Sequence, residues 1–185
     1  MDGGYIIGGE TGHYHNQDYL LLKVDSNGNK KWSKRFNDKE DCSANDVVEV
    51  SNGDFYLVGS KRIIYKRENI RIIKLNSSGK KIWDKNYGGD NDDIGEGIVE
   101  SDNGLVIAAS TYSYGEKGDV MLLKIDTDGD VVWKKTYGGN KEDQLRFVDG
   151  NTMSGRHLVK TSDGGFLVSG YTKSFAEQPD PQYCV

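Results

Sequence analysis

One segment of about fifteen residues occurs three times in this chain, at an interval of about fifty residues. Its copies cover 18–32, 69–83 and 119–133, and each contains a Lys, an Asp or Asn turn with Gly, and a terminal Trp. The three tryptophans lie 51 and 50 residues apart. Repeats of this period are typical of arrays in which each unit buries its apolar face against the next. The chain is therefore expected to build several copies of one small unit.

A second segment recurs upstream of each of these copies. It begins at Tyr5, Phe55, Leu105 and Phe166, each time after a short run of Gly with Asp or Asn. The first two intervals are 50 residues and the last is 61. The longer interval predicts an insertion of roughly ten residues in the fourth repeat, somewhere in 146–157.

Each repeat divides into four short strands separated by turn residues. In the third repeat the strands are expected at 97–101, 105–110 and 120–126, and the fourth follows Gly129 and carries Trp133 and Tyr137. The Asx-Gly pairs between strands suit tight turns because Gly adopts a positive φ without strain. The third strand is apolar at almost every position, which is typical of a strand covered on both faces.

Four-stranded units of this kind bury both faces when they stack around an axis, as the blades of a β-propeller do. The predicted fold is all-β: a β-propeller of about 50-residue blades with four antiparallel strands each. A flat β-solenoid is the alternative, although its coils usually repeat at a shorter period. The blades are expected at about 1–37, 38–89, 90–139 and 140–185, in a single domain over 1–185.

The set of predicted strands is incomplete at both ends. The first repeat lacks its first strand and the fourth stops after its second, which leaves about three and a quarter blades, whereas closed propellers usually have at least four. Open ends would present unpaired strand edges and apolar faces. We therefore expect that missing blades of a longer chain complete the ring, or that copies self-associate.

The repeat resembles that of a group of prokaryotic β-propeller repeat proteins. Their units read roughly Asp-Gly-Gly-aromatic-aliphatic-aliphatic-x-Gly, then Asp-x-x-Leu-x-Lys-aliphatic-Asp-x-x-Gly-x-x-x-Trp, then Lys-x-Tyr-Gly-Gly, and residues 102–139 carry nearly all of this. The turn-to-tryptophan element also resembles, at a spacing one residue shorter, the docking motif of quinoprotein-like propellers, in which the Trp of one blade stacks on the next. The pair Gly8-Gly9 resembles the double glycine of kelch repeats.

This resemblance implies a partial propeller of a secreted or cell-surface protein and assigns no activity and no cofactor. The N-terminal residues carry neither the basic region nor the apolar core of a signal peptide. A net charge of −5 argues against a general nucleic-acid binder, and no apolar stretch is long enough for a membrane span. Only Cys42 and Cys184 occur, so a disulfide framework is excluded, and whether these two pair is left open.

The residues that recur in every repeat are predicted to be structural anchors. A Trp at a fixed place in each unit, among apolar neighbours, is expected to pack between blades, and the turn glycines keep the same spacing. These anchors are Trp32, Trp83, Trp133, Gly28, Gly79 and Gly129.

Two groups of residues suggest a metal site, and neither is predicted to be one. Asp126, Asp128 and Asp130 could offer oxygens to calcium, but the equivalent turns in the other repeats carry fewer acids, so a hairpin turn explains all three. His13 and His15 supply only two imidazoles, fewer than a zinc site needs. We therefore predict no metal and no cofactor.

The loops between the second and third strands differ most from repeat to repeat, and variable loops on a fixed scaffold often bind ligands. Their aromatic and basic residues could stack on a sugar or contact a protein. The candidate ligand-binding residues are His13, Tyr14, His15, Tyr65, Arg67, Tyr112 and Tyr114.

We therefore predict a non-catalytic binding module for a protein or carbohydrate ligand, with no catalytic residue assigned. One alternative is a fragment of a propeller enzyme, a hydrolase or lyase, with active carboxylates among the acids at the blade junctions, such as Asp93 and Asp143. The other is a purely structural spacer of a larger surface protein.

Overall fold

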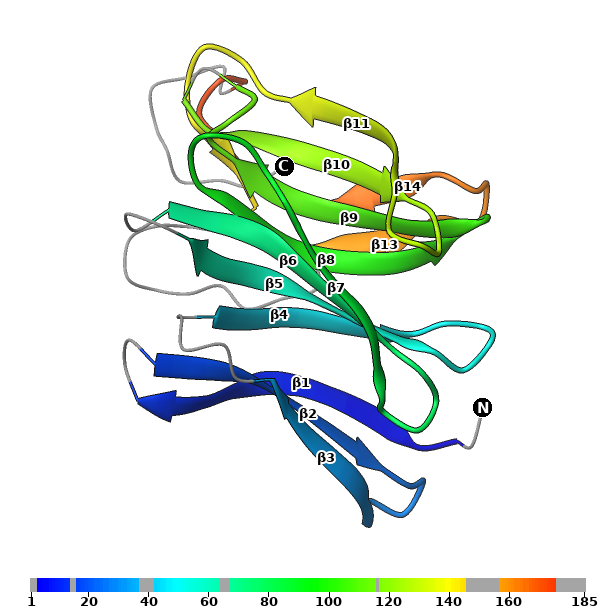
Figure 1. Ribbon diagram of the computed structural model, residues 1–185. Helices are drawn as coiled ribbons and strands as arrows, with labels where there is room; N and C mark the ends of the chain where they lie inside the picture. The colour runs from blue at the N-terminus through cyan, green and yellow to red at the C-terminus, as the bar shows by residue number, and fades with distance from the viewer. Residues whose placement is uncertain are drawn as a thin grey trace.

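The computed structural model describes residues 3–13, 16–36, 42–63, 67–115, 117–145 and 157–175. Every regular element within these ranges is a β-strand, and the strands form antiparallel sheets (Figure 1). The predicted all-β class is thereby confirmed, with sheets of three and four strands. Among the described residues, no helix has the length and apolar character needed to cross a membrane.

The strands follow one another in chain order within each sheet. The first sheet contains β1 (Tyr5–His13), β2 (Asn16–Val24) and β3 (Lys30–Phe36). The second contains β4 (Cys42–Glu49), β5 (Phe55–Ile63), β6 (Arg67–Leu75) and β7 (Lys81–Tyr87). The third contains β8 (Asp93–Ser101), β9 (Gly104–Thr111), β10 (Asp119–Ile125) and β11 (Val131–Tyr137).

The sequence repeat corresponds to a repeat in strand register. In the first three sheets the recurring Lys faces the recurring Trp across the last strand pair, as Lys74 faces Trp83 and Lys124 faces Trp133. The register shifts by one residue directly after each of these lysines. Each shift leads into a turn closed by a Gly at positive φ, 84° at Gly129. The fixed spacing of Lys, Gly and Trp is therefore the spacing that one hairpin geometry requires.

The sheets stack face to face, and the apolar core lies between them (Figure 1). β1 and β2 pack on β4, and β8 packs across β4, β5 and β6. The cluster between the second and third sheets joins Ile70 and Ile72 of β6 to Met121, Leu123 and Ile125 of β10. Because β9 and β10 alternate their side chains between two neighbouring layers, nearly all of their residues are buried.

A fourth unit follows the third sheet as two short strand pairs. β12 (Asp143–Gln144) pairs with β15 (Tyr171–Thr172), and β13 (Leu158–Lys160) pairs with β14 (Phe166–Val168). They correspond to the first two strands of a repeat, each interrupted once. The first strands β4 and β8 carry a register shift at the corresponding place, after Ala44 and Gly95. The insertion predicted within 146–157 falls at this point, and residues 146–156 lie outside the described part of the chain.

Candidate functional site

A buried aspartate holds the start of a sheet to the preceding junction in both the third and the fourth units. Asp93 accepts hydrogen bonds from the Gly89 N–H (2.8 Å) and from the hydroxyls of Thr111 and Ser113. In the fourth unit, Asp143 accepts the equivalent bonds from the Gly139 N–H (2.8 Å), Thr172 and Ser174. We call each of these arrangements an aspartate clasp.

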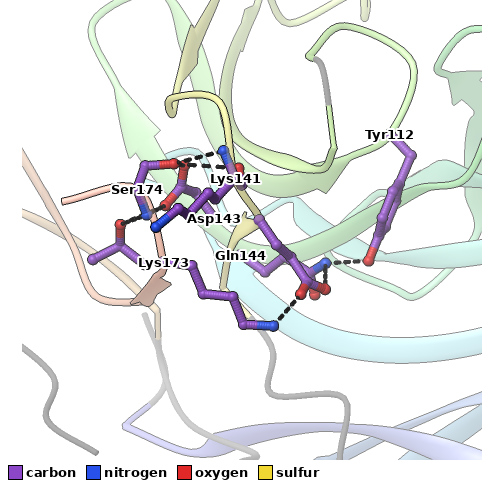
Figure 2. A network of polar contacts seen from close by, with 8 residues as sticks. Tyr112, Lys141, Asp143, Gln144, Lys173 and Ser174 are labelled. Carbon is purple, nitrogen blue, oxygen red and sulfur yellow. Dashed lines mark hydrogen bonds and ion pairs between the residues drawn. The ribbon is translucent and has the colours of Figure 1, made fainter. Parts of the chain in front are cut away.

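The clasp at Asp143 stabilises the ionised carboxylate (Figure 2). Burial by itself would raise the pKa of Asp143, but hydrogen bonds from the hydroxyls of Ser174 and Thr172 and from backbone N–H groups outweigh it and lower the pKa. Ser174 is in turn fixed by the Lys141 N–H, which donates a hydrogen bond of 3.1 Å to its hydroxyl oxygen. The carboxylate is therefore a structural acceptor that remains charged at neutral pH.

The first junction has a thiol at the position of these aspartates. Cys42 begins β4 as Asp93 begins β8, and it is buried. Its sulfur accepts a hydrogen bond from Nη1 of Arg71 (3.2 Å). Arg71 is 1 % exposed, makes two hydrogen bonds to the Asp84 carboxylate (2.9 and 2.7 Å) and lies over the Tyr19 ring. Cys184 lies outside the described residues.

A second polar network lies beside the clasp at Asp143 and links the third unit to the fourth (Figure 2). The Gln144 amide donates to the hydroxyl oxygen of Tyr112 and to Oε1 of Glu142 (2.7 Å), and Lys173 forms an ion pair with Glu142 (2.7 Å). Burial, and after it the negative charge of Glu142, raises the pKa of Tyr112. Tyr112 therefore remains a neutral phenol that ties the loop after β9 to β12.

A cleft of about 380 Å³ opens between the third sheet and the fourth unit. Val120 and Leu122 of β10 line one side, and Phe166 and Val168 of β14 line the other. The cleft continues the apolar cluster that Leu122 forms with the fourth unit. A largely apolar hollow with a few polar groups at its margin is the common form of a binding site.

Aromatic side chains are exposed at this cleft. Tyr137 at the end of β11 is 50 % exposed and Phe175 is 67 % exposed, and both line it, together with Tyr171. The clasp residues Asp143 and Thr172 are its polar margin. Exposed aromatic rings beside charged groups can contact either a polypeptide or the apolar face of a sugar. The cleft and the two networks are therefore the candidate site.

Two of the predicted ligand-binding residues lie in the loop after β9, and both make contacts within the protein. Tyr112 is held by Gln144, as described above. Tyr114 donates a hydrogen bond to the Gly88 carbonyl (2.6 Å), and the Lys134 ammonium lies 3.1 Å from the centre of its ring. This loop also borders the candidate site, because the Asp143 N–H donates to the Gly118 carbonyl (2.8 Å).

The other predicted ligand-binding residues are far from the cleft along the stack or lie outside the described part. Arg67 begins β6 and is exposed. The backbone of His13 ends β1, and its side chain is outside the described part, as are Tyr14, His15 and Tyr65. Of the predicted residues whose side chains the structure describes, Tyr112 and Tyr114 lie in the loop that borders the candidate site, and Arg67 does not line the cleft.

Two of the recurring glycines, Gly79 and Gly129, lie against the recurring Trp of the preceding sheet. Trp32 contacts Phe55 edge to face, with ring centres 5.7 Å apart, and a Cβ built on Gly79 would lie 3.2 Å from the Trp32 ring. The indole N–H of Trp83 donates to the Thr127 carbonyl (3.3 Å) in the turn that contains Gly129. Trp133 packs with the apolar cluster between the third sheet and the fourth unit.

The turn at Asp126, Asp128 and Asp130, which was considered as a calcium site, has the same hydrogen bonds as the equivalent turns of the first and second sheets. Oδ1 of Asp126 accepts hydrogen bonds from the backbone N–H groups of Asp128 and Asp130, both at 2.9 Å. Asp25 and Asn76 make the same pair of bonds in the first and second sheets. An Asx turn therefore accounts for all three loops.

The ligand-binding residues predicted from the sequence do not include Phe175 or Lys173, and Tyr137 was predicted only as part of a strand. A usable signal was present, because Tyr137 recurs with Phe36 and Tyr87. Tyr87 is followed by a complete further repeat, whose turn carbonyl at Gly129 accepts its hydroxyl (2.7 Å). Tyr137 is followed by a repeat with only its first two strands among the described residues, so a half-exposed aromatic residue was predictable there.

Comparison with models of known protein families gives no match, and no curated protein matches the chain either.

Proposed function

We propose that this chain is a partial β-propeller that acts as a non-catalytic interaction module, with its ligand-binding surface at the junction of the third sheet and the fourth unit. The observation that carries the proposal is the open cleft of about 380 Å³, whose walls are apolar and whose exposed aromatic residues lie beside a fixed polar network. Its ligand is a protein or a carbohydrate.

The blade assignment is supported by the regular build of the stack. The second and third sheets have four antiparallel strands in chain order and the same register between the recurring Lys and Trp. Trp83 of the second sheet contacts the turn of the third sheet, and Trp32 of the first sheet lies beside Gly79 in the turn of the second. Such repetition is what radially stacked blades require.

The state of Asp143 favours binding over catalysis. A hydrolase or lyase would use a carboxyl group that exchanges a proton near its working pH. Asp143 lines the cleft, but its hydrogen bonds lower its pKa and occupy both carboxylate oxygens. It is therefore suited to holding the wall of a binding site in place.

The test is a ligand screen that includes matched variants. The full chain is screened against a glycan array and a displayed random-peptide library, and the ligands found are remeasured with Tyr137→Ala and Phe175→Ala. Both residues are exposed cleft residues, so these variants should keep the wild-type melting temperature and lose affinity by roughly tenfold, as truncation of an aromatic contact typically does.

Val132→Ala is the control for this screen. Val132 is exposed on β11, where alternation places it on the face opposite to Tyr137. A ligand that binds the two cleft variants as tightly as the wild type would exclude this surface.

A further inference from the structure

Positive charge is concentrated in the last strand of each of the first three sheets. The strands β3, β7 and β11 have seven residues each and together carry eight Lys or Arg residues, four in β3 and two in each of the others, against one acidic residue, Asp84. The whole chain has 24 basic and 29 acidic residues, so the rest of it has 16 basic residues against 28 acidic ones. A chain with a net negative charge thus has three strongly basic strands.

These three strands form one continuous surface along the stack. Within the described part, each pairs only with the strand before it, so each is the edge of its sheet. Lys34 of β3 lies against the turn that leads into β7, because a Cβ built on Gly79 would be 3.3 Å from its Cε. Lys85 of β7 donates a hydrogen bond to Asp130 (2.9 Å), the residue directly before β11. We call the surface formed by β3, β7 and β11 the basic rim.

Several charges of the basic rim are available to a partner. Lys30 and Lys34 of β3 and Lys135 of β11 are exposed, and within the described part of the chain no carboxylate forms an ion pair with them. Their positive charges are therefore balanced by solvent ions, which an anionic ligand would displace on binding.

Protection of the sheet edges does not by itself explain the basic rim. Charged side chains on an edge strand prevent pairing with other sheets, and acidic residues serve this purpose as well as basic ones. Here one sign of charge prevails on all three edges, although acids outnumber bases in the chain. A surface of uniform sign attracts a partner of the opposite sign.

We propose that the basic rim binds a linear acidic polysaccharide, which carries carboxylate or sulfate groups along its length. Basic residues that recur from sheet to sheet match a partner whose charges also recur. This surface is a second binding site, beyond the cleft between the third sheet and the fourth unit.

The rim is less suited to nucleic acids than to a polysaccharide. Proteins that bind single strands stack the bases on aromatic rings, but the tryptophans of the rim are used between sheets: Trp32 packs edge to face on Phe55, and Trp83 donates to the Thr127 carbonyl. A duplex carries phosphates on two strands and would also meet the acidic remainder of the surface. A single thin chain can stay on the rim.

The test measures binding of the full-length protein to immobilised heparin by surface plasmon resonance, with uncharged dextran as the reference surface. We expect saturable binding to heparin at about 50 mM salt that weakens steeply as the salt concentration rises, because release of counterions drives such an association. Single-stranded polyuridylate, duplex DNA and polyglutamate are measured under the same conditions.

Two variants locate the binding surface. Lys30→Gln/Lys34→Gln removes two charges from β3 and should weaken heparin binding by roughly tenfold. Lys135→Gln should weaken it by about threefold, because the same polysaccharide chain extends from the first sheet to the third. All three side chains are exposed, so both variants should keep the wild-type melting temperature.

Lys117→Gln/Lys141→Gln is the matched control for the double variant. It makes the same change in net charge at two exposed lysines outside the rim, one before β10 and one before β12. Its affinity for heparin should stay within about twofold of the wild type. Phe175→Ala should also leave heparin binding unchanged, so that the rim and the cleft are tested independently.

Several outcomes would overturn the proposal. These are no saturable binding to heparin, an equal loss of affinity in the control and the rim variants, and rim variants that bind as the wild type does. Rim variants that aggregate while their heparin affinity is unchanged would assign the lysines to edge protection alone. Tighter binding of polyuridylate, duplex DNA or polyglutamate than of heparin, with the same dependence on Lys30 and Lys34, would identify a nucleic acid or an acidic protein as the partner instead.

Discussion

At the residue scale, the buried charged side chains Asp93 and Arg71 are stabilised by hydrogen bonds and close contacts with neighbouring groups. Asp93 is fully buried, and its carboxylate is bonded by one backbone N–H and two hydroxyls. Arg71 is equally buried and lies between a carboxylate, a thiol and an aromatic ring. A buried charge that loses its partner is strongly destabilising, so these residues give the sharpest tests of the structure.

The clasp at Asp143 predicts a stability difference that depends on pH. Asp143→Asn should reduce the free energy of unfolding by about 1–3 kcal/mol at pH 7, the usual effect of weakening hydrogen bonds to a buried charge. Because the folded-state pKa of Asp143 is lowered, its contribution is present above the unfolded pKa of about 4 and is lost as pH falls through the folded value. Urea unfolding of both proteins at pH 7 and near pH 3 measures the difference.

The difference in unfolding free energy between the wild type and Asp143→Asn should therefore be smaller near pH 3 than at pH 7. Asp130→Asn serves as the control, since the Asp130 side chain is largely exposed and its ion pair with Lys85 is a surface one. If this difference in unfolding free energy were the same at both pH values, the clasp would not depend on an ionised Asp143.

Because Arg71 and Asp84 form a buried ion pair, removing Asp84 alone should destabilise the protein more than replacing both residues. Asp84→Ala leaves the guanidinium buried without its main partner and should destabilise the protein by about 3–5 kcal/mol. Adding Arg71→Met removes that charge and supplies the residue found at the equivalent position in the third sheet, Met121. Chemical unfolding of the two singles and the double forms a mutant cycle. A double variant no more stable than Asp84→Ala would refute the pairing.

At the scale of elements, the turn of one sheet is shaped to meet the preceding sheet. Gly28 and Gly129 both have φ of 84°, but a Cβ on Gly28 would meet nothing within 4 Å. A Cβ on Gly129 would lie 2.9 Å from the Tyr87 hydroxyl and 3.1 Å from the Trp83 ring. The two glycines share the same backbone conformation and differ in their neighbours.

Substitution by alanine should therefore destabilise the protein less at Gly28 than at Gly129. Gly28→Ala should destabilise by about 1–2 kcal/mol through the strain of positive φ alone. Gly129→Ala should lose about 1–2 kcal/mol more, because the methyl group pushes on the packed contact to the second sheet. Thermal and urea unfolding measure both. Equal losses of unfolding free energy in the two variants would mean that the contacts of the Gly129 turn with Trp83 and Tyr87 do not contribute to stability.

Elements and register were largely predictable from the sequence, whereas the candidate site was not. The third strand of the third repeat was expected at 120–126 and lies at Asp119–Ile125, because its apolar run and its Asx-Gly turn fix both ends locally. The contact between Tyr112 and Gln144 joins residues 32 positions apart and depends on how two sheets lie against each other. A repeat pattern gives positions along a strand and leaves that angle undetermined, so the contact between Tyr112 and Gln144 could not be predicted from the sequence.

At the scale of the whole molecule, stability should vary from sheet to sheet along the stack. The second and third sheets are covered on both faces, and β9 is buried along its whole length. Among the described residues, the first sheet is covered on one face, and Tyr5 and Ile7 of β1 are exposed at 62 % and 50 %. In stacked repeats, each unit is stabilised mainly by its neighbours, so units with one described neighbour should open first.

Native-state hydrogen exchange should resolve this order. Amides of β5, β6, β9 and β10 should open only with global unfolding, while those of β1, β13 and β14 should exchange through partial openings that require about 2–3 kcal/mol less. Mass spectrometry of peptic fragments at increasing low concentrations of urea measures these free energies strand by strand. Gly129→Ala should lower the opening free energy of the third sheet and fourth unit more than that of the first sheet, because it loosens the boundary after β7. Equal protection in all strands would instead mean that the sheets unfold as one cooperative unit, and that their stacking is stronger than the folding of any single sheet.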